Sequence, residues 1–78
     1  MHPMTIALKK ALPGYAVEEK PESWELDENG NYRLYWFIHR GDEIKWASFI
    51  TDKPDIGDAD RPAWAEAAAK RIEAAFND

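Results

Sequence analysis

Residues that could take part in catalysis are few in this sequence. His39, followed by Asp42 and Glu43, offers an imidazole close in sequence to two carboxylates, which is one arrangement for acid–base catalysis. A histidine beside a turn is, however, more often simply solvated. The chain contains no Cys, and neither Ser23 nor Ser48 lies in the G-x-S-x-G context of a serine hydrolase. We therefore predict a protein that is not an enzyme.

Four aspartates between residues 52 and 60 raise the question of a calcium site. They are Asp52, Asp55, Asp58 and Asp60. An EF-hand loop needs acids at positions 1, 3 and 5, Gly at position 6 and Glu at position 12. Here the acids fall at positions 1, 4, 7 and 9, and position 12 is Ala63. We expect a solvated connection whose last aspartates lie at the positive end of the next helix, with no metal and no cofactor.

The length of the chain suits a single domain over residues 1–78. Without Cys, its stabilisation has to come from apolar burial, for which four Trp, three Tyr and three Phe are available. No stretch approaches the roughly 18 apolar residues of a membrane span, and the N-terminal segment lacks a signal-peptide pattern. We expect a soluble, cytoplasmic protein with no membrane partner.

The net charge of −5 is unevenly distributed, and residues 18–28 carry six acids against one Lys. A protein that binds nucleic acid needs a basic footprint that displaces phosphate counterions, and the chain as a whole lacks one. The charge favours instead a protein partner with a basic surface. The glutamates expected to contact it are Glu18, Glu19, Glu22 and Glu25. The alternative is an edge strand that its charges and Pro21 keep unpaired.

The sequence predicts two helices separated by three strands. The helices are expected at 3–12 and 61–76, and the strands at about 15–26, 32–39 and 43–51. A Pro-Gly pair ends the first helix, and a stripe of apolar side chains at helical spacing defines the second. The predicted fold is α+β, a three-stranded antiparallel meander with a short N-terminal helix and a C-terminal helix packed on one face (α-β-β-β-α).

The turns set the expected register of the strands. A three-residue loop at 28–30 pairs Glu25 with Arg33, and a three- or five-residue loop within HRGDE aligns Trp36 with Trp46. The inner face would then consist of Trp24, Leu26, Tyr32, Leu34, Trp36, Ile38, Ile44, Trp46 and Ile50. The outer face would carry Ser23, Glu25, Arg33, Tyr35, Phe37, His39, Lys45, Ala47, Phe49 and Thr51. Because a one-residue slip exchanges the faces of a strand, this assignment depends on the turns.

Tyr35, Phe37 and Phe49 are expected to form an exposed patch, with Arg33 beside them. Exposed clusters of aromatic side chains usually mark protein-binding surfaces. Two alternatives stay open: the N-terminal helix or a second copy of the chain covers the patch, or the patch stacks nucleic-acid bases. A homodimer could form through this outer face or through the edge strand at 43–51, which could equally accept a strand from another protein.

Two families share parts of this arrangement. The α-β-β-β-α order and the stretch AEAAAKRIEAAF resemble the double-stranded-RNA-binding domain and its Ala-rich second helix. That family grips phosphates with a Lys cluster at the start of this helix. The matching stretch here is DADRPAWAE, so the resemblance implies the fold without RNA binding. The stretch ASFIT before an Ala-rich helix also resembles the arm-binding domains of phage integrases, which read DNA with a basic sheet; Arg33, Arg40 and Lys45 would take that part.

A small, acidic, Cys-free and aromatic-rich chain also resembles phage-encoded inhibitors, including anti-CRISPR proteins and DNA mimics. Such proteins occupy basic surfaces of nucleic-acid-handling complexes. We therefore predict a non-enzymatic protein-binding module, an inhibitor from a phage or mobile element. The alternative is a nucleic-acid-binding three-stranded sheet domain of the RNA-binding or integrase arm-binding type, and a homodimer that uses the outer face is the third possibility.

Overall fold

The structure, a computed structural model, describes residues 2–20 and 25–77. Its elements are α1 (Pro3–Ala11), β1 (Ala16–Glu19), β2 (Glu25–Leu26), β3 (Tyr32–Arg40), β4 (Glu43–Thr51) and α2 (Arg61–Asn77). The predicted α+β class, with an antiparallel sheet between an N-terminal and a C-terminal helix, is confirmed. Within the described ranges the sheet has four strands instead of three, because β1 and β2 both come from the stretch expected to form one strand.

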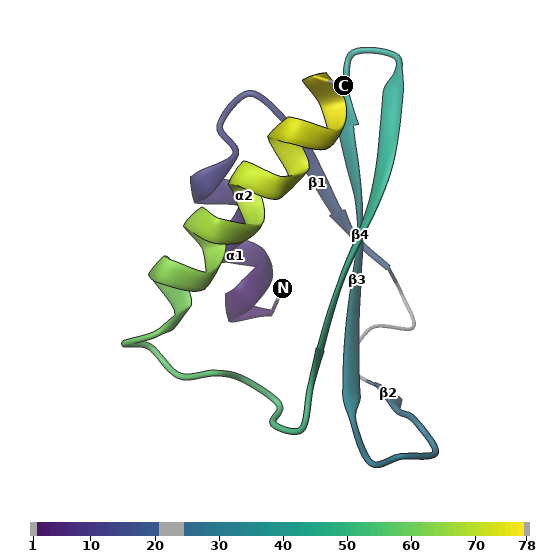
Figure 1. Cartoon of the computed structure of the whole chain (residues 1–78), viewed down its shortest axis with the longest axis vertical. Coiled ribbons are helices and arrows are strands. Elements are labelled where there is room, and N and C mark those ends of the chain that lie inside the picture. The colour runs from purple at the N-terminus through teal and green to yellow at the C-terminus, as the bar shows by residue number, and fades with distance from the viewer. Residues whose placement is uncertain (1, 21–24, 78) are drawn as a thin grey trace.

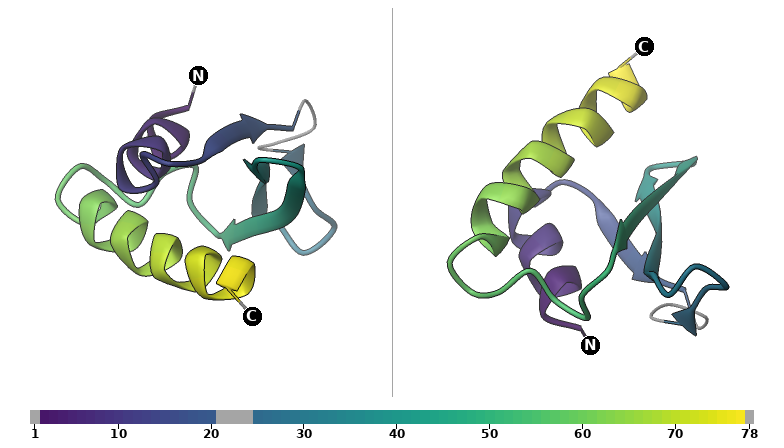
Figure 2. Two further views of the ribbon diagram at one scale, coloured as in Figure 1. Left: turned by 90° about the horizontal axis from the view of Figure 1, so that it is seen from above. Right: turned by 60° about the horizontal axis from the view of Figure 1, so that its bottom comes forward.

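β3 is the central strand, and β4 runs along one of its sides. β1 and β2 both pair with the other side of β3, β1 opposite residues 36–39 and β2 opposite residues 32–33. The two helices contact each other and lie on the same side of the sheet, so the molecule has two layers (Figure 1). We call this side the inner face. The other side, the outer face, is covered by no helix or strand of the described ranges (Figure 2).

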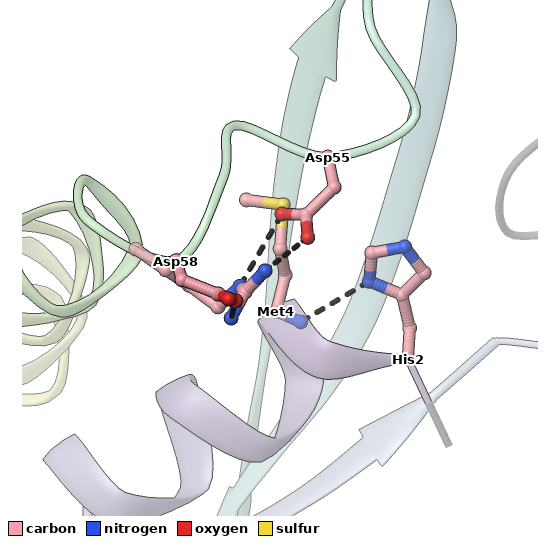
Figure 3. Close-up of polar contacts among 5 residues, drawn as sticks. His2, Met4, Asp55 and Asp58 are labelled. Atoms are coloured by element: carbon pink, nitrogen blue, oxygen red, sulfur yellow. Dashed lines mark hydrogen bonds and ion pairs between the residues drawn. The ribbon is translucent and has the colours of Figure 1, made fainter.

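Local sequence explains where α1 begins. The Nδ1 atom of His2 accepts a hydrogen bond from the amide of Met4 at 3.1 Å, which satisfies a free donor of the first turn (Figure 3). Burial lowers the pKa of His2, which favours the neutral ring that can accept this bond. Pro3 follows, where the missing amide proton costs nothing. Neither described helix is long and apolar enough to cross a bilayer.

The core lies between the inner face and the two helices. Every second residue in the middle of β3 is fully buried there, namely Leu34, Trp36 and Ile38. The indole Nε1 of Trp36 donates a hydrogen bond of 2.9 Å to the hydroxyl of Thr5 on α1, and this hydroxyl donates in turn to the carboxylate of Glu19. The predicted inner position of these three β3 residues is confirmed.

The turn between β2 and β3 is the predicted three-residue loop. Glu25 lies opposite Arg33, and Leu26 lies opposite Tyr32. Gly30 adopts a φ of +80°, the left-handed conformation that its place in this loop requires. The prediction that Leu26 belongs to the core is wrong, because its side chain is 61 % exposed. β2 pairs with the end of β3 that extends beyond the helices, so neither helix covers Leu26 (Figure 1).

The predicted register between β3 and β4 is wrong by one residue. A two-residue turn, Gly41-Asp42, joins the strands, and Gly41 adopts a φ of +58°. Two-residue hairpin turns need a positive φ at their first residue, and Gly supplies it without strain. Trp46 therefore lies opposite Phe37 instead of Trp36.

The slip exchanges the two faces of β4, because successive side chains of a strand point to opposite sides. Three residues expected on the inner face lie on the outer face: Ile44, Trp46 and Ile50. Four residues expected on the outer face lie on the inner face: Lys45, Ala47, Phe49 and Thr51. Ser23 and Trp24, which the sequence assigned to the first strand, lie outside the described residues.

Candidate functional site

The outer face is the candidate site, because it gathers exposed apolar side chains. None of the described helices lies over this side of the sheet (Figure 2). β3 contributes Arg33, Tyr35, Phe37 and His39 to it, and β4 contributes Ile44, Trp46, Ser48 and Ile50. β1 adds Ala16 and Glu18, which lie opposite His39 and Phe37. The alternation of side chains along a strand places all of these on one side of the sheet.

Three rings pack together at the centre of this face and form what we call the outer aromatic cluster: Tyr35, Phe37 and Trp46. The ring centroid of Trp46 lies 5.0 Å from that of Tyr35 and 5.7 Å from that of Phe37. Phe37 and Trp46 are directly opposite each other, where cross-strand pairs stabilise a sheet. Trp46 nevertheless stays 55 % exposed, so much of its indole is accessible to a partner.

Lys20 lies over the cluster, just beyond the end of β1. Its Nζ is 5.1 Å from the ring centroid of Trp46 and 5.7 Å from that of Phe37. A cation over an aromatic ring at this distance is attracted by about 0.5–1 kcal/mol at an exposed site. The amide of Lys20 donates to the carbonyl of Tyr35 at 2.9 Å, which ties its backbone to the sheet. Lys20 therefore places a positive charge at the edge of the aromatic surface.

Two aliphatic side chains extend the apolar surface along β4. Ile44 is 59 % exposed and Ile50 is 53 % exposed. Trp46 lies between them on the same side of the strand, next to Ile44, and Ser48 separates it from Ile50. Single exposed apolar residues are common on protein surfaces, but a contiguous group usually marks an interaction site. The accessible apolar surface is thus concentrated on β4.

Arg33 fixes the position of Tyr35 at one end of the cluster. Its guanidinium donates to the Tyr35 hydroxyl at 3.2 Å and to the Asp27 carboxylate at 3.1 Å. The hydrogen bond with Tyr35, followed by that with Asp27, raises the pKa of Arg33. The backbone amide of Asn31, helped by Arg33, lowers the pKa of Asp27, so this carboxylate stays charged. Arg33 lies on the outer face as predicted.

The four glutamates predicted to contact a partner do not lie together. Glu18 and Glu25 belong to the outer face, on β1 and β2. Glu19, the neighbour of Glu18, turns to the inner side and accepts the hydrogen bond from Thr5. Glu22 lies outside the described residues. The acidic segment is therefore divided between the two faces of the sheet.

The prediction that Phe49 completes the exposed patch is wrong, because Phe49 packs in the core. Its ring meets that of Trp64 on α2 edge to face, with centroids 5.0 Å apart. Trp46 takes the place that the sequence assigned to Phe49. Both faces of β4 carry an aromatic residue, so either register pairs apolar side chains across the strands, and only the turn distinguishes them.

The aspartate-rich connection before α2 is held by an arginine (Figure 3). Arg61 donates to Asp55 through two of its nitrogens and to Asp58 at 2.7 Å. The hydrogen bond with Arg61 is the main reason that the pKa of Asp55 is lowered. Within residues 2–20 and 25–77, no group of three or more His, Cys, Asp or Glu side chains is placed to hold a metal ion. The connection is a structural clamp at the start of α2.

The charged residues beside the Gly41-Asp42 turn of the β3–β4 hairpin also hold the fold together. Glu43 accepts a hydrogen bond of 3.2 Å from Arg40, so its carboxylate is engaged there and not as a partner of His39. Arg40 donates as well to the carbonyl of Phe76 at 2.8 Å. Because the C-terminal end of a helix carries partial negative charge, Arg40 anchors α2 to the sheet.

The sequence placed Tyr35, Phe37 and Arg33 correctly on the outer face and missed the remaining members of the apolar surface and its rim. The missed residues are Lys20, Ile44, Trp46 and Ile50. Gly41 was the available signal, because it permits the two-residue turn that sets the register of β4. Comparison with models of protein families, with curated proteins and with solved structures found no match to this chain.

Proposed function

We propose that this chain is a non-enzymatic protein-binding module that docks its partner through the outer face of the sheet. The observation that carries the proposal is Trp46, more than half exposed at the centre of the outer aromatic cluster. Trp and Tyr are among the residues that most often dominate the binding energy of protein interfaces. The sheet holds these rings in place before binding, so little side-chain entropy is lost on docking.

The surroundings of the cluster support a protein as the partner. Ile44 and Ile50 extend the apolar area along β4. Charges of both signs, from Lys20 and Glu18, lie beside it. An apolar centre with a polar rim is the usual anatomy of a protein interface.

The proposal extends to the class of partner: a basic surface of a nucleic-acid-handling complex, which this chain occupies as an inhibitor encoded by a phage or mobile element. It is supported by the net charge of −5, by Glu18 and Glu25 on the outer face, and by the resemblance to small acidic inhibitors such as anti-CRISPR proteins and DNA mimics. Opposite charges speed association with a basic target and disfavour acidic ones. A target of this kind places the protein in the cytoplasm.

A nucleic-acid-binding sheet is the second candidate, because unpaired bases stack on exposed rings and Lys20 lies beside the outer aromatic cluster. Two of the cations expected to assist, Arg40 and Lys45, lie on the inner side of the sheet. Titration with a single-stranded and a duplex oligonucleotide separates the candidates. We expect no binding at physiological salt. Micromolar affinity that falls steeply as salt increases would favour nucleic acid and overturn the inhibitor proposal.

Affinity capture from a bacterial lysate tests the proposed function. The wild-type chain should retain a partner, and both Trp46→Ser and the double variant Tyr35→Ala/Phe37→Ala should lose it. Ile6→Ser is the matched control, since Ile6 is an exposed apolar residue of α1, away from the outer face. Circular dichroism should first show the same fold for every variant. Retention of the same partner by all four chains would overturn the proposal.

A further inference from the structure

A groove runs between the free edge of β4 and α2, on the inner side of the sheet. Its volume is about 240 Å³. β4 lines it with Lys45, Ala47 and Phe49, and α2 lines it with Ala68, Arg71 and Ile72. The groove is mainly apolar, and its charged lining residues, Lys45 and Arg71, are both cations.

The edge of β4 beside this groove is unpaired within the described ranges. Arg40 and Glu43 close a two-residue turn, so they form a hydrogen-bonded pair, and such pairs alternate along an antiparallel ladder. It follows that every second residue from Ile44 to Ile50 directs its amide and carbonyl groups away from β3. Edge strands are usually protected by Pro, a bulge or several charges. β4 pairs with β3 without a bulge from residue 43 to 51, and its only interior charge is Lys45.

We propose that the edge of β4 accepts an extended segment of the partner protein as an additional strand, with a carboxylate of that segment between Lys45 and Arg71. The proposal rests on the proposed function, protein binding, and adds where the partner's chain runs and what chemistry it carries. Side chains of an added strand would alternate between the two faces. Those on the outer face would cover Ile44, Trp46 and Ile50, and those on the inner face would enter the groove.

The charges of the groove select an acidic segment. Neither Lys45 nor Arg71 forms an ion pair with another side chain in the described part of the protein. Both are exposed beside apolar side chains, where a carboxylate would gain charge-assisted hydrogen bonds. The groove is therefore locally basic although the chain carries a net charge of −5. A basic surface of the same partner would meet Glu18 and Glu25 on the opposite side of the sheet.

A second copy of this chain fits the groove less well. If β4 paired with itself, the added strand would bring another Lys45 to a site that already holds two cations. The acid that β4 carries on the same face is Glu43, and Arg40 already binds it. Charge complementarity thus favours an acidic segment of a different protein over a second copy of this chain.

The test uses a display library of random ten-residue peptides selected on the full chain. We expect the selected peptides to combine alternating apolar residues with at least one Asp or Glu. The variant Lys45→Glu/Arg71→Glu should select peptides with Lys or Arg at the corresponding position and bind the original peptides at least tenfold more weakly. Lys9→Glu/Lys70→Glu, which changes the net charge equally at exposed sites elsewhere, is the control and should bind like the wild type. Failure to select any peptide, or equal binding by the reversed variant, would overturn the proposal.

Ser48→Pro tests strand addition separately, because Ser48 directs its amide away from β3 and Pro is tolerated at such edge positions. It should abolish peptide binding while circular dichroism and the outer aromatic cluster remain unchanged. If a captured partner is lost with Trp46→Ser but retained by Ser48→Pro and by the charge-reversed variant, the strand is not added and the proposed function still stands. If sedimentation shows a wild-type dimer that Ser48→Pro dissociates, the edge belongs to a second copy and the proposal fails.

Discussion

The two sides of β3 carry similarly apolar residues in different surroundings. On the inner face Leu34, Trp36 and Ile38 are covered by α1 and α2. On the outer face Tyr35 and Phe37 are only half-buried among side chains of neighbouring strands. An apolar side chain stabilises the fold where the fold removes it from water, and it promotes association where a partner does so. The inner face should therefore determine stability and the outer face binding.

Replacement of Trp36 should have the largest effect on stability. Its ring lies 5.7 Å from that of Trp64, and its indole nitrogen binds Thr5. Trp36→Ala leaves a large cavity in the core and removes the hydrogen bond that the Thr5 hydroxyl accepts, and should lower the free energy of unfolding by about 3–5 kcal/mol. Urea denaturation measures this loss. A loss below about 1 kcal/mol would mean that the inner face is not the core.

The pair Phe49→Ala and Trp46→Ala tests the register of β4. Phe49 packs against α2, so its truncation should cost about 2–3 kcal/mol of folding free energy. Trp46 is the larger side chain but lies on the exposed face, so its truncation should cost about 1 kcal/mol. Urea denaturation measures the loss in the free energy of unfolding for each variant. A larger loss for Trp46→Ala than for Phe49→Ala would support the register that places Trp46 in the core.

Acid denaturation compares the clamp at Arg61 with an arginine outside it. Because Arg61 lowers the pKa of Asp55 in the folded state, this pair adds stability above the ordinary Asp value of 3.8 and loses it as pH falls through the lowered pKa. Arg61→Ala should therefore flatten the fall in stability between about pH 5 and pH 2. Arg71→Ala should leave the pH dependence unchanged. If the stability of wild type and of Arg61→Ala fell identically below about pH 5, the ion pair between Arg61 and Asp55 would be excluded as a source of stability.

Sedimentation of the wild type and of Trp46→Glu should show the smallest difference. We expect both to be monomers, since the outer face is assigned to a different protein. A wild-type dimer that Trp46→Glu dissociates would mean that a second copy covers the outer face. The comparison of the two faces would then hold, but the occupant would be another copy of this chain.

Much of the fold could be predicted because its signals are local. Pro13-Gly14 ends α1, and Leu34, Trp36 and Ile38 alternate along β3 with the spacing of a half-buried strand. The loop before β3 was predicted because Gly30 occupies the position that requires a positive φ.

The register of β4 could not be predicted from apolar pairing. β3 and β4 both carry aromatic residues on each face, so Trp46 finds an aromatic neighbour whether it lies opposite Trp36 or Phe37. The choice was decided by a two-residue turn at Gly41, and it moved the centre of the candidate site from Phe49 to Trp46. The groove beside β4 was not predictable either, since it requires knowing that Lys45 faces α2.

The indole NMR signals of Trp36 and Trp46 test the central claim most directly, because the two rings report on the two faces. The captured partner is added to the ¹⁵N-labelled chain, and the resonance of each indole N–H is followed after assignment with single Trp→Phe variants. We expect the Trp46 signal to shift or broaden most as the partner binds, and the Trp36 signal, whose indole N–H is held by Thr5 in the core, to change less. A shift of Trp36 or Trp64 with Trp46 unaffected would place the partner on the helical side and contradict the assignment of binding to the outer face.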